Sequence, residues 1–193
     1  MKKSLITLSI LAVATLYACS PGSASLTTGS SFSVNDTKKN TTTEISISDN
    51  IVVAGSAGTV TGIVKKDKRK YYTSSNEMKY AVKFSDDGFK LRDHNEQLLW
   101  KVKLYDDKIK VSDNEEMTNA YEIKLRDEGK LKLEQHESLI TEIRLHATDE
   151  WVDVESYKVK GVGISLAPGL LLIKELTEME KIILMAEIRA KGR

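Results

Sequence analysis

The chain has 193 residues and carries 29 Lys and Arg against 28 Asp and Glu, a formal net charge of +1 at pH 7. This balance argues against a dedicated nucleic-acid-binding protein, which normally has a clear basic excess. A hydrophobic share of 40% beside a charged share of 30% is typical of a globular protein and excludes wholesale disorder. The single cysteine excludes an internal disulfide and a thiolate metal cage.

The first twenty residues have the features of an export signal. Lys2 and Lys3 precede an apolar stretch, residues 4–16, which is too short to span the roughly 30 Å hydrocarbon core of a bilayer. Its length and flanks are those of a secretory signal. The run that follows, Leu16-Tyr17-Ala18-Cys19-Ser20, resembles the bacterial lipoprotein signal, with Leu three positions before the Cys and a small residue directly before it.

This resemblance implies cleavage between Ala18 and Cys19, with a diacylglyceride on the Cys19 thiol and an acyl chain on its amine. Leu16 and Ala18 are then signal-recognition residues, and residues 1–18 are removed. Several acyl chains hold a protein firmly on a bilayer, because each buried CH₂ contributes about 0.8 kcal/mol. The predicted location is the cell envelope; in a cell with two membranes, Ser20 fits sorting to the outer membrane, facing the periplasm. The alternative is an ordinary signal peptide in which Cys19 is incidental.

A polar segment separates this signal from the rest of the chain. Residues 19–43 contain few large apolar side chains, which are Leu26, Phe32 and Val34. Such a composition cannot offset its own ordering entropy, so it predicts a flexible tether. The alternative is an N-terminal strand that includes Phe32 and Val34. Residues 44–193 are the predicted folded body, which is long enough to bury roughly 70% of the unfolded chain's surface.

The body contains a hairpin repeat whose units begin at Tyr80, Trp100 and Tyr121. Within each unit, large apolar residues alternate with charged ones, a period-two pattern typical of antiparallel strands packed on one side. The apolar positions are Tyr80, Val82, Phe84, Trp100, Val102, Leu104, Tyr121, Ile123 and Leu125, and the charged ones include Lys83, Lys101, Lys103, Glu122 and Lys124.

Turn residues join the two strands of each unit. Asp86-Asp87-Gly88, Asp106-Asp107-Lys108 and Asp127-Glu128-Gly129 occupy equivalent places, and Asp and Gly favour hairpin turns. The third unit has one extra residue before its alternation resumes at Leu131, which predicts a bulge. Further short strands are predicted at 45–47, 51–53, 60–64, 71–73, 143–145, 152–154 and 157–159. Ten or more such strands form either two sheets or a closed barrel.

The C-terminal part changes to a helical pattern. Thr177 with Glu180 forms a capping box that predicts a helix start near Thr177, and Pro168 suits the first turn of a preceding apolar segment. A helix that is apolar all round is buried on every side, so a closed sheet is its simplest surrounding. The residues predicted to form this buried core are Ile182, Ile183, Leu184, Met185 and Ala186.

The hairpin repeats, the segment Leu98-Leu99-Trp100-Lys101-Val102 and the apolar C-terminal segment together resemble the tubby-like fold, over roughly residues 58–190. Tubby, LURP-one-related and phospholipid scramblase proteins share this fold. The resemblance implies a mainly β protein: a closed antiparallel barrel, of about 10–12 strands here, around a hydrophobic C-terminal helix. The alternatives are a lipocalin-like barrel with a C-terminal helix and a β-sandwich.

The sequence contains no recognisable catalytic motif. His94, His136 and His146 are scattered, and His136 lacks a second His four positions on, so the zinc-protease helix is missing. The acidic cluster at residues 106–116 lacks the central Gly and distal Glu of an EF-hand, and hairpin turns explain it. We therefore expect no catalytic residue, no metal site and no cofactor besides the diacylglyceride on Cys19.

One charged feature suggests a binding site. A predicted hairpin tip carries the cations Lys65, Lys66, Lys68, Arg69 and Lys70. Cations near an anionic membrane surface contribute about 1 kcal/mol each, so the tip is a candidate for binding lipid head groups. Some tubby-like domains bind phosphoinositides through a basic pocket, so the resemblance also suggests binding of anionic head groups. The alternative is a solvated turn that discourages edge-to-edge aggregation.

These observations lead to one preferred function and two alternatives. The preferred hypothesis is a lipid-anchored envelope protein that acts as a non-catalytic binding or structural module. Its expected partners are the membrane, through the anchor, and a lipid or an envelope protein, without nucleic acid. The first alternative is a carrier of an apolar or anionic lipid ligand, held in the barrel or at its basic rim. The second is an envelope-acting hydrolase, and the only sequence feature that supports it is the abundance of Asp and Glu.

Overall fold

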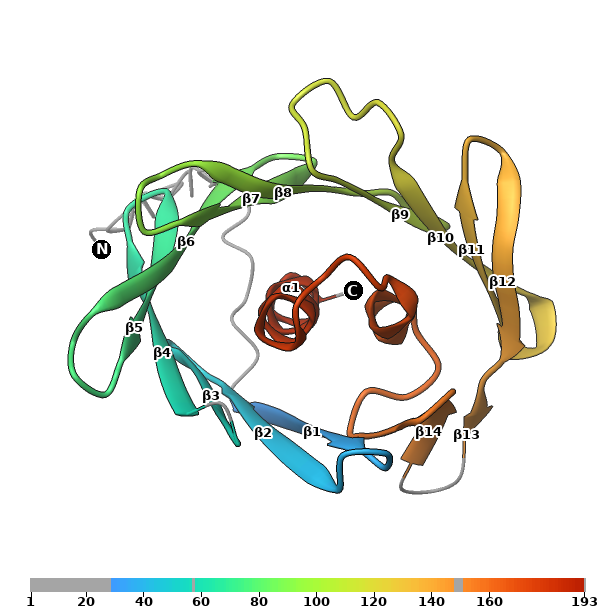
Figure 1. The fold of residues 1–193 in the computed structure, drawn as a ribbon, viewed down its shortest axis with the longest axis horizontal. Coiled ribbons are helices and arrows are strands. Elements are labelled where there is room, and N and C mark those ends of the chain that lie inside the picture. Colours follow the sequence, from blue (N-terminus) through green and yellow to red (C-terminus); the bar gives the residue numbers. More distant parts are fainter. Residues whose placement is uncertain (1–28, 57, 148–150, 193) are drawn as a thin grey trace, which may run out of the picture.

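The computed structural model describes residues 29–56, 58–147 and 151–192. The predictions for Leu16, Ala18 and Cys19 lie outside these residues. Within the described ranges a single antiparallel sheet of 15 strands curls into a nearly closed barrel (Figure 1). The strands are β1 (Ser30–Asp36), β2 (Thr41–Ile47), β3 (Ile51–Gly55), β4 (Gly58–Lys65), β5 (Lys68–Thr73), β6 (Met78–Ser85), β7 (Gly88–Asp93), β8 (Leu98–Leu104), β9 (Lys108–Ser112), β10 (Tyr121–Arg126), β11 (Lys130–Gln135), β12 (Ser138–Arg144), β13 (His146–Ala147), β14 (Trp151–Val154) and β15 (Tyr157–Lys160).

The order of strands around the barrel follows the chain almost throughout. Strands β1 to β12 are hydrogen-bonded in sequence, and β15, β14 and β13 continue the sheet from the other side of β1. The two edge strands, β12 and β13, are consecutive in the chain with only Leu145 between them. The predicted barrel is thus confirmed, with more strands in the described residues than the ten to twelve expected.

The body of the protein begins at Ser30, so the predicted boundary between tether and body at residue 44 is wrong. Strand β1 pairs with β2 along its whole length and with β15 through residues 33–36. Phe32 and Val34 face the core and are each 4% exposed. Two large apolar residues with a spacing of two are enough for a strand here, because both of its neighbours supply hydrogen bonds.

The hairpin repeat corresponds to β6–β11, with buried positions alternating as predicted. Gly88 is required where β7 begins, because a Cβ atom there would lie 1.9 Å from the Val102 carbonyl oxygen. The extra residue of the third unit does not form a bulge. Instead it lengthens the turn into a 3₁₀ segment, η1 (Asp127–Gly129), and the pairing of β10 with β11 stays in register.

Two helical segments fill the barrel (Figure 1). The 3₁₀ helix η2 (Ala167–Leu172) starts with Pro168 in its first turn, and α1 (Glu178–Ala190) starts with the predicted capping box of Thr177 and Glu180. Residues 182–186 are at most 4% exposed, which confirms the buried helix core. None of the helices among the described residues is long and apolar enough to cross a membrane.

The barrel has two ends, which differ in the chain segments that reach them. The described chain enters β1 at the end that also holds the β4–β5 and β6–β7 turns and the end of α1, where Lys191 Nζ bonds the Ser85 carbonyl oxygen. We call this the proximal end. The opposite, distal end holds the β1–β2, β3–β4 and β14–β15 turns and the start of α1, where Lys39 pairs with Glu178.

We expect Ile183→Asp to unfold the protein. The Ile183 side chain is fully buried, and a carboxylate in its place would have no partner, at a cost of more than about 4 kcal/mol. Urea unfolding followed by circular dichroism measures this loss. Lys83→Ala, on the outer face of β6, should shift the free energy of unfolding by less than about 0.5 kcal/mol. An unchanged urea midpoint for Ile183→Asp would contradict the enclosed helix.

Candidate functional site

A buried polar cluster ties α1 to the barrel wall. Glu187 on the helix accepts hydrogen bonds from Arg69 Nη1 at 2.6 Å and from the Tyr71 hydroxyl at 2.7 Å, both on β5. Burial raises the pKa of the Glu187 carboxyl, and the charge of Arg69 and its hydrogen bonds oppose that shift. Since the Arg69 and Glu187 side chains are at most 5% exposed, the cluster has no access for a substrate. Its geometry suits a structural anchor.

Arg69 therefore does not belong to the surface cation cluster that the sequence predicted. Strand alternation places Arg69 inward beside Tyr71, with 4% of its surface exposed. Lys65 and Lys66 are exposed at the predicted hairpin tip, and Lys68 and Lys70 are partly exposed on the outer face of β5.

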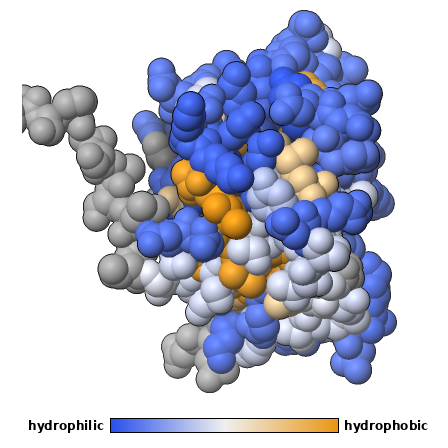
Figure 2. Space-filling model, turned by 90° about the vertical axis from the view of Figure 1, so that its left-hand side faces the viewer, coloured by the Kyte–Doolittle hydropathy of each residue, from blue (hydrophilic) through white to orange (hydrophobic). Residues whose placement is uncertain are grey.

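Acidic turns surround this basic tip at the proximal end. Each described hairpin turn at that end carries at least one exposed aspartate; these are Asp49, Asp67, Asp86, Asp87, Asp106, Asp107 and Asp127. On the side of the barrel formed by β4–β6, Figure 2 shows a small apolar patch within a mostly hydrophilic surface. Ile63 and Val64 of β4 are 39% and 45% exposed. The acidic turns weaken the case for an anionic-lipid site confined to the tip.

A pocket of about 140 Å³ opens at the distal end between the sheet and the start of α1. Its walls come from β1, β2, β3, Tyr157 of β15 and the first turns of α1. The apolar lining residues are Val34, Val53, Met179 and Ile182, and the ionisable ones are Asp36, Lys39, Tyr157 and Glu178. The pocket therefore combines an apolar floor with a charged rim.

The rim is organised around the Lys39 ammonium. Lys39 Nζ lies 3.4 Å from Asp36 Oδ2 and 3.4 Å from Glu178 Oε1, and the Tyr157 hydroxyl donates to Glu178 Oε1 at 3.0 Å. Burial disfavours the charged form of Asp36, but hydrogen bonds from Lys39 and from the Lys38 amide outweigh it and lower its pKa. Burial and the charge of Glu178 raise the pKa of the Tyr157 phenol. A cation between two carboxylates thus stands over an apolar cavity.

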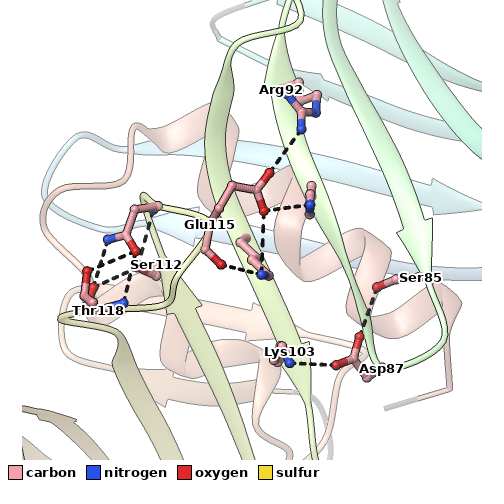
Figure 3. Close-up of polar contacts among 10 residues, drawn as sticks. Ser85, Asp87, Arg92, Lys103, Ser112, Glu115 and Thr118 are labelled. Carbon is pink, nitrogen blue, oxygen red and sulfur yellow. Dashed lines mark hydrogen bonds and ion pairs between the residues drawn. The ribbon is translucent and has the colours of Figure 1, made fainter.

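A second charged cluster lies on the outer wall and was missed by the sequence analysis (Figure 3). Glu115, in the loop between β9 and β10, contacts Lys90 at 2.6 Å, Arg92 at 3.3 Å and Lys101 at 3.6 Å. The hydrogen bond from Lys90, together with the neighbouring cations, lowers the pKa of Glu115 although burial opposes it. Its cationic partners belong to β7 and β8, so only the three-dimensional pairing of the strands brings them together.

The histidines do not form a site. His94 and His136 lie in different turns, and His146 lies in β13. Among the residues that the structure describes, no three His, Cys, Asp or Glu side chains come together in a way that could hold a metal ion.

Comparison with known proteins identifies no relative: no protein-family model, curated protein or solved structure matches this chain. The function is therefore inferred from the sequence and from the geometry of the described residues.

Glu187→Leu tests the anchor of α1. It leaves the Arg69 guanidinium buried without its partner, so we expect a loss of about 3–5 kcal/mol in the free energy of unfolding, measured with urea. The double variant Glu187→Leu/Arg69→Met removes both charges and should recover most of that loss, because an apolar pair of similar size needs no counter-charge. Additive losses in the double variant would contradict a coupled buried pair.

Proposed function

We propose that this protein is a lipid-anchored, non-catalytic binding module of the cell envelope, built on a tubby-like barrel. Two observations support the proposal: the run Leu16-Tyr17-Ala18-Cys19 resembles a lipoprotein signal, and an antiparallel barrel encloses an apolar C-terminal helix. The barrel departs from the twelve strands of the tubby-like fold, with 15 in the described residues. This kinship is part of the proposal.

The observation that carries the proposal is the opposite placement of the chain's entrance and the pocket. Ser30 starts β1 at the proximal end, while the pocket opens at the distal end. The ten residues 19–28 precede the described chain and span at most about 35 Å. A lipid on Cys19 would then attach the protein to the bilayer from its proximal end, with the pocket at the opposite end of the barrel.

The pocket geometry favours a small ligand over a lipid tail. A volume of about 140 Å³ lies below the roughly 300–1,000 Å³ of pockets for drug-sized ligands, and resembles the roughly 150 Å³ cavity that takes up benzene in a protein core. A lipid carried inside the barrel would have to displace α1, whose residues 183–186 are fully buried. The binding-module hypothesis is therefore preferred over the carrier.

The charged rim indicates the class of ligand. The Lys39 side chain is 57% exposed, so its ammonium can leave Asp36 and Glu178 without unfolding the wall. A ligand ammonium can take its place between the two carboxylates while its apolar body rests on Val34 and Ile182. We propose a small cationic ligand with one benzene-sized apolar group.

The anchor is tested by metabolic labelling with a clickable fatty acid. The wild-type chain should incorporate the label and partition with membranes, and Cys19→Ala should do neither, because the proposed modification needs the thiol. Ser20→Ala leaves the thiol in place and should be labelled like the wild type. Equal labelling of the wild type and Cys19→Ala would contradict the anchor.

The pocket is tested by titrating the purified chain with benzylammonium and following amide chemical shifts. We expect shifts to cluster around Asp36 and Glu178, and Glu178→Gln to weaken binding at least fivefold through loss of one carboxylate. Lys39→Ala should tighten binding, because it removes the internal cation. Lys38→Ala, one residue outside the pocket lining, is the matched control and should bind like the wild type. Equal binding of neutral benzyl alcohol would contradict a charge-selective site.

A further inference from the structure

The outer face of β5–β9 carries cations without a carboxylate of its own. On these five strands the outward positions alternate with buried residues such as Tyr71, Val82 and Leu91. Ten outward positions are cationic, and none is Asp or Glu. The cations are Lys68, Lys70, Lys79, Lys83, Lys90, Arg92, Lys101, Lys103, Lys108 and Lys110.

Four of these lysines stand directly opposite one another across four neighbouring strands. The register pairs Lys68 with Lys83, Lys83 with Lys90, and Lys90 with Lys101. Strands lie about 4.8 Å apart, so the row presents one positive charge for every strand it crosses. Like charges directly opposite each other destabilise a sheet, so stability of the fold alone does not account for this row.

The neighbouring strands β10–β12 carry a different arrangement of charges on their outer face. On β10–β12, carboxylates alternate with the lysines on the outer face: Glu122 and Glu134 pair with Lys124, and Glu142 pairs with Lys132. Exposed Lys–Glu pairs on a sheet are therefore available to this sequence. Asp and Glu are absent from the outward positions of β5–β9, although Lys108 and Lys110 on its β9 edge pair with Glu122 of β10. The absence of carboxylates from its own strands marks that face as different.

The neutralising charge for the lysine row comes from loops. Glu115 lies across Lys90, Arg92 and Lys101, and its backbone carbonyl oxygen accepts a hydrogen bond from Lys101 (Figure 3). The Glu115 side chain is still 41% exposed. Lys83 forms no ion pair within the described part of the chain. Glu96, in the turn between β7 and β8, lies 3.9 Å from Lys68 at the other end of the row. Loop carboxylates therefore contact Lys68, Lys90 and Lys101 and leave Lys83 without one.

We propose that the outer face of β5–β9 binds a linear polyanion with one negative charge per repeat, at a spacing of about 5–7 Å. Glu115 then acts as an internal competitor that covers Lys90 and Lys101 until the polymer displaces it. This spacing matches both the separation between strands and the roughly 6.7 Å between alternate residues along a strand. The inference is independent of the distal pocket, and the proposed anchor enters only the choice of a polymer over a bilayer.

The geometry favours a polymer over a bilayer as the occupant of this face. The row runs around the convex wall of the barrel, across the strands, so a flexible chain can follow it, whereas a flat membrane meets only part of it. The proximal end, from which the proposed anchor would attach, carries exposed aspartates in its described hairpin turns.

The test uses the detergent-solubilised full chain and two fluorescent polymers, poly(glycerol phosphate) and polygalacturonate, whose binding is followed by anisotropy. We expect at least one polymer to bind, with an affinity that falls as salt rises, because binding releases counter-ions. Lys83→Glu/Lys90→Glu should weaken binding at least tenfold. Lys38→Glu/Lys158→Glu, with the same change in net charge near β1 and β15, should change it less than twofold.

The variant Glu115→Gln tests whether Glu115 competes with the polymer or only forms a structural ion pair. Removing the competing charge should tighten polymer binding severalfold, whereas Glu116→Gln, its exposed loop neighbour, should leave it nearly unchanged. Binding of poly(glycerol phosphate) alone identifies phosphodiester chemistry, and binding of polygalacturonate alone identifies carboxylate chemistry; either supports the proposal. Equal affinities of the two loop variants would overturn it. Binding to phosphatidylglycerol vesicles without binding to either polymer would also overturn it.

Discussion

The enclosure of α1 by the sheet is the interaction on which the rest of this structure depends. A helix that is apolar on every side cannot lie on a surface in water, and a sheet with one apolar face cannot leave that face exposed. Each element buries what the other leaves uncovered, with residues 183–186 fully buried at the centre. Because the protein's own helix fills the interior, recognition of a ligand is confined to the mouths and the outer wall of the barrel.

Apolar packing alone leaves the rotation and depth of α1 poorly determined, and polar contacts specify both. Trp100 Nε1 donates to Glu180 at 3.2 Å near the start of the helix, while Arg69 and Tyr71 bond Glu187 near its end. A buried ion pair is weak support for stability but strongly disfavours a wrong register, in which its charges would lose their partners. The two contacts join opposite ends of the helix to β8 and β5. They thereby hold the capping-box turn, which contributes Glu178 to the distal pocket, at a defined depth.

Local patterns predicted most of the architecture, and pairings between distant segments account for what was missed. Alternation along 80–84 and 100–104 predicted strands, and Thr177 with Glu180 predicted the start of α1. Strand β1 was assigned to the tether because its Ser-rich sequence has only Phe32 and Val34 as large apolar residues, and its partner β15 lies more than 120 positions away. The inward orientation of Arg69 was available from its spacing to Tyr71, but the density of neighbouring lysines favoured a surface cluster. The contacts of Lys39 with Glu178 depend on where the helix sits, which no local pattern contains.

The charges of this nearly neutral chain are segregated by the geometry of the barrel. Aspartates gather in the hairpin turns because they bond the turn backbone, while the outward positions of β5–β9 hold lysine and arginine without carboxylates. The net charge of +1 is therefore the sum of acidic turns at the proximal end and cationic side chains on the outer face of β5–β9, among other charges. Overall charge argued against a nucleic-acid-binding protein, but it carries no information about a local field, which falls off within roughly 8–10 Å at physiological salt. On that length scale the field depends on which carboxylates lie beside each lysine of the row, and Lys83 is the member that has none among the described residues. A weak net charge is therefore compatible with the proposed polyanion-binding surface.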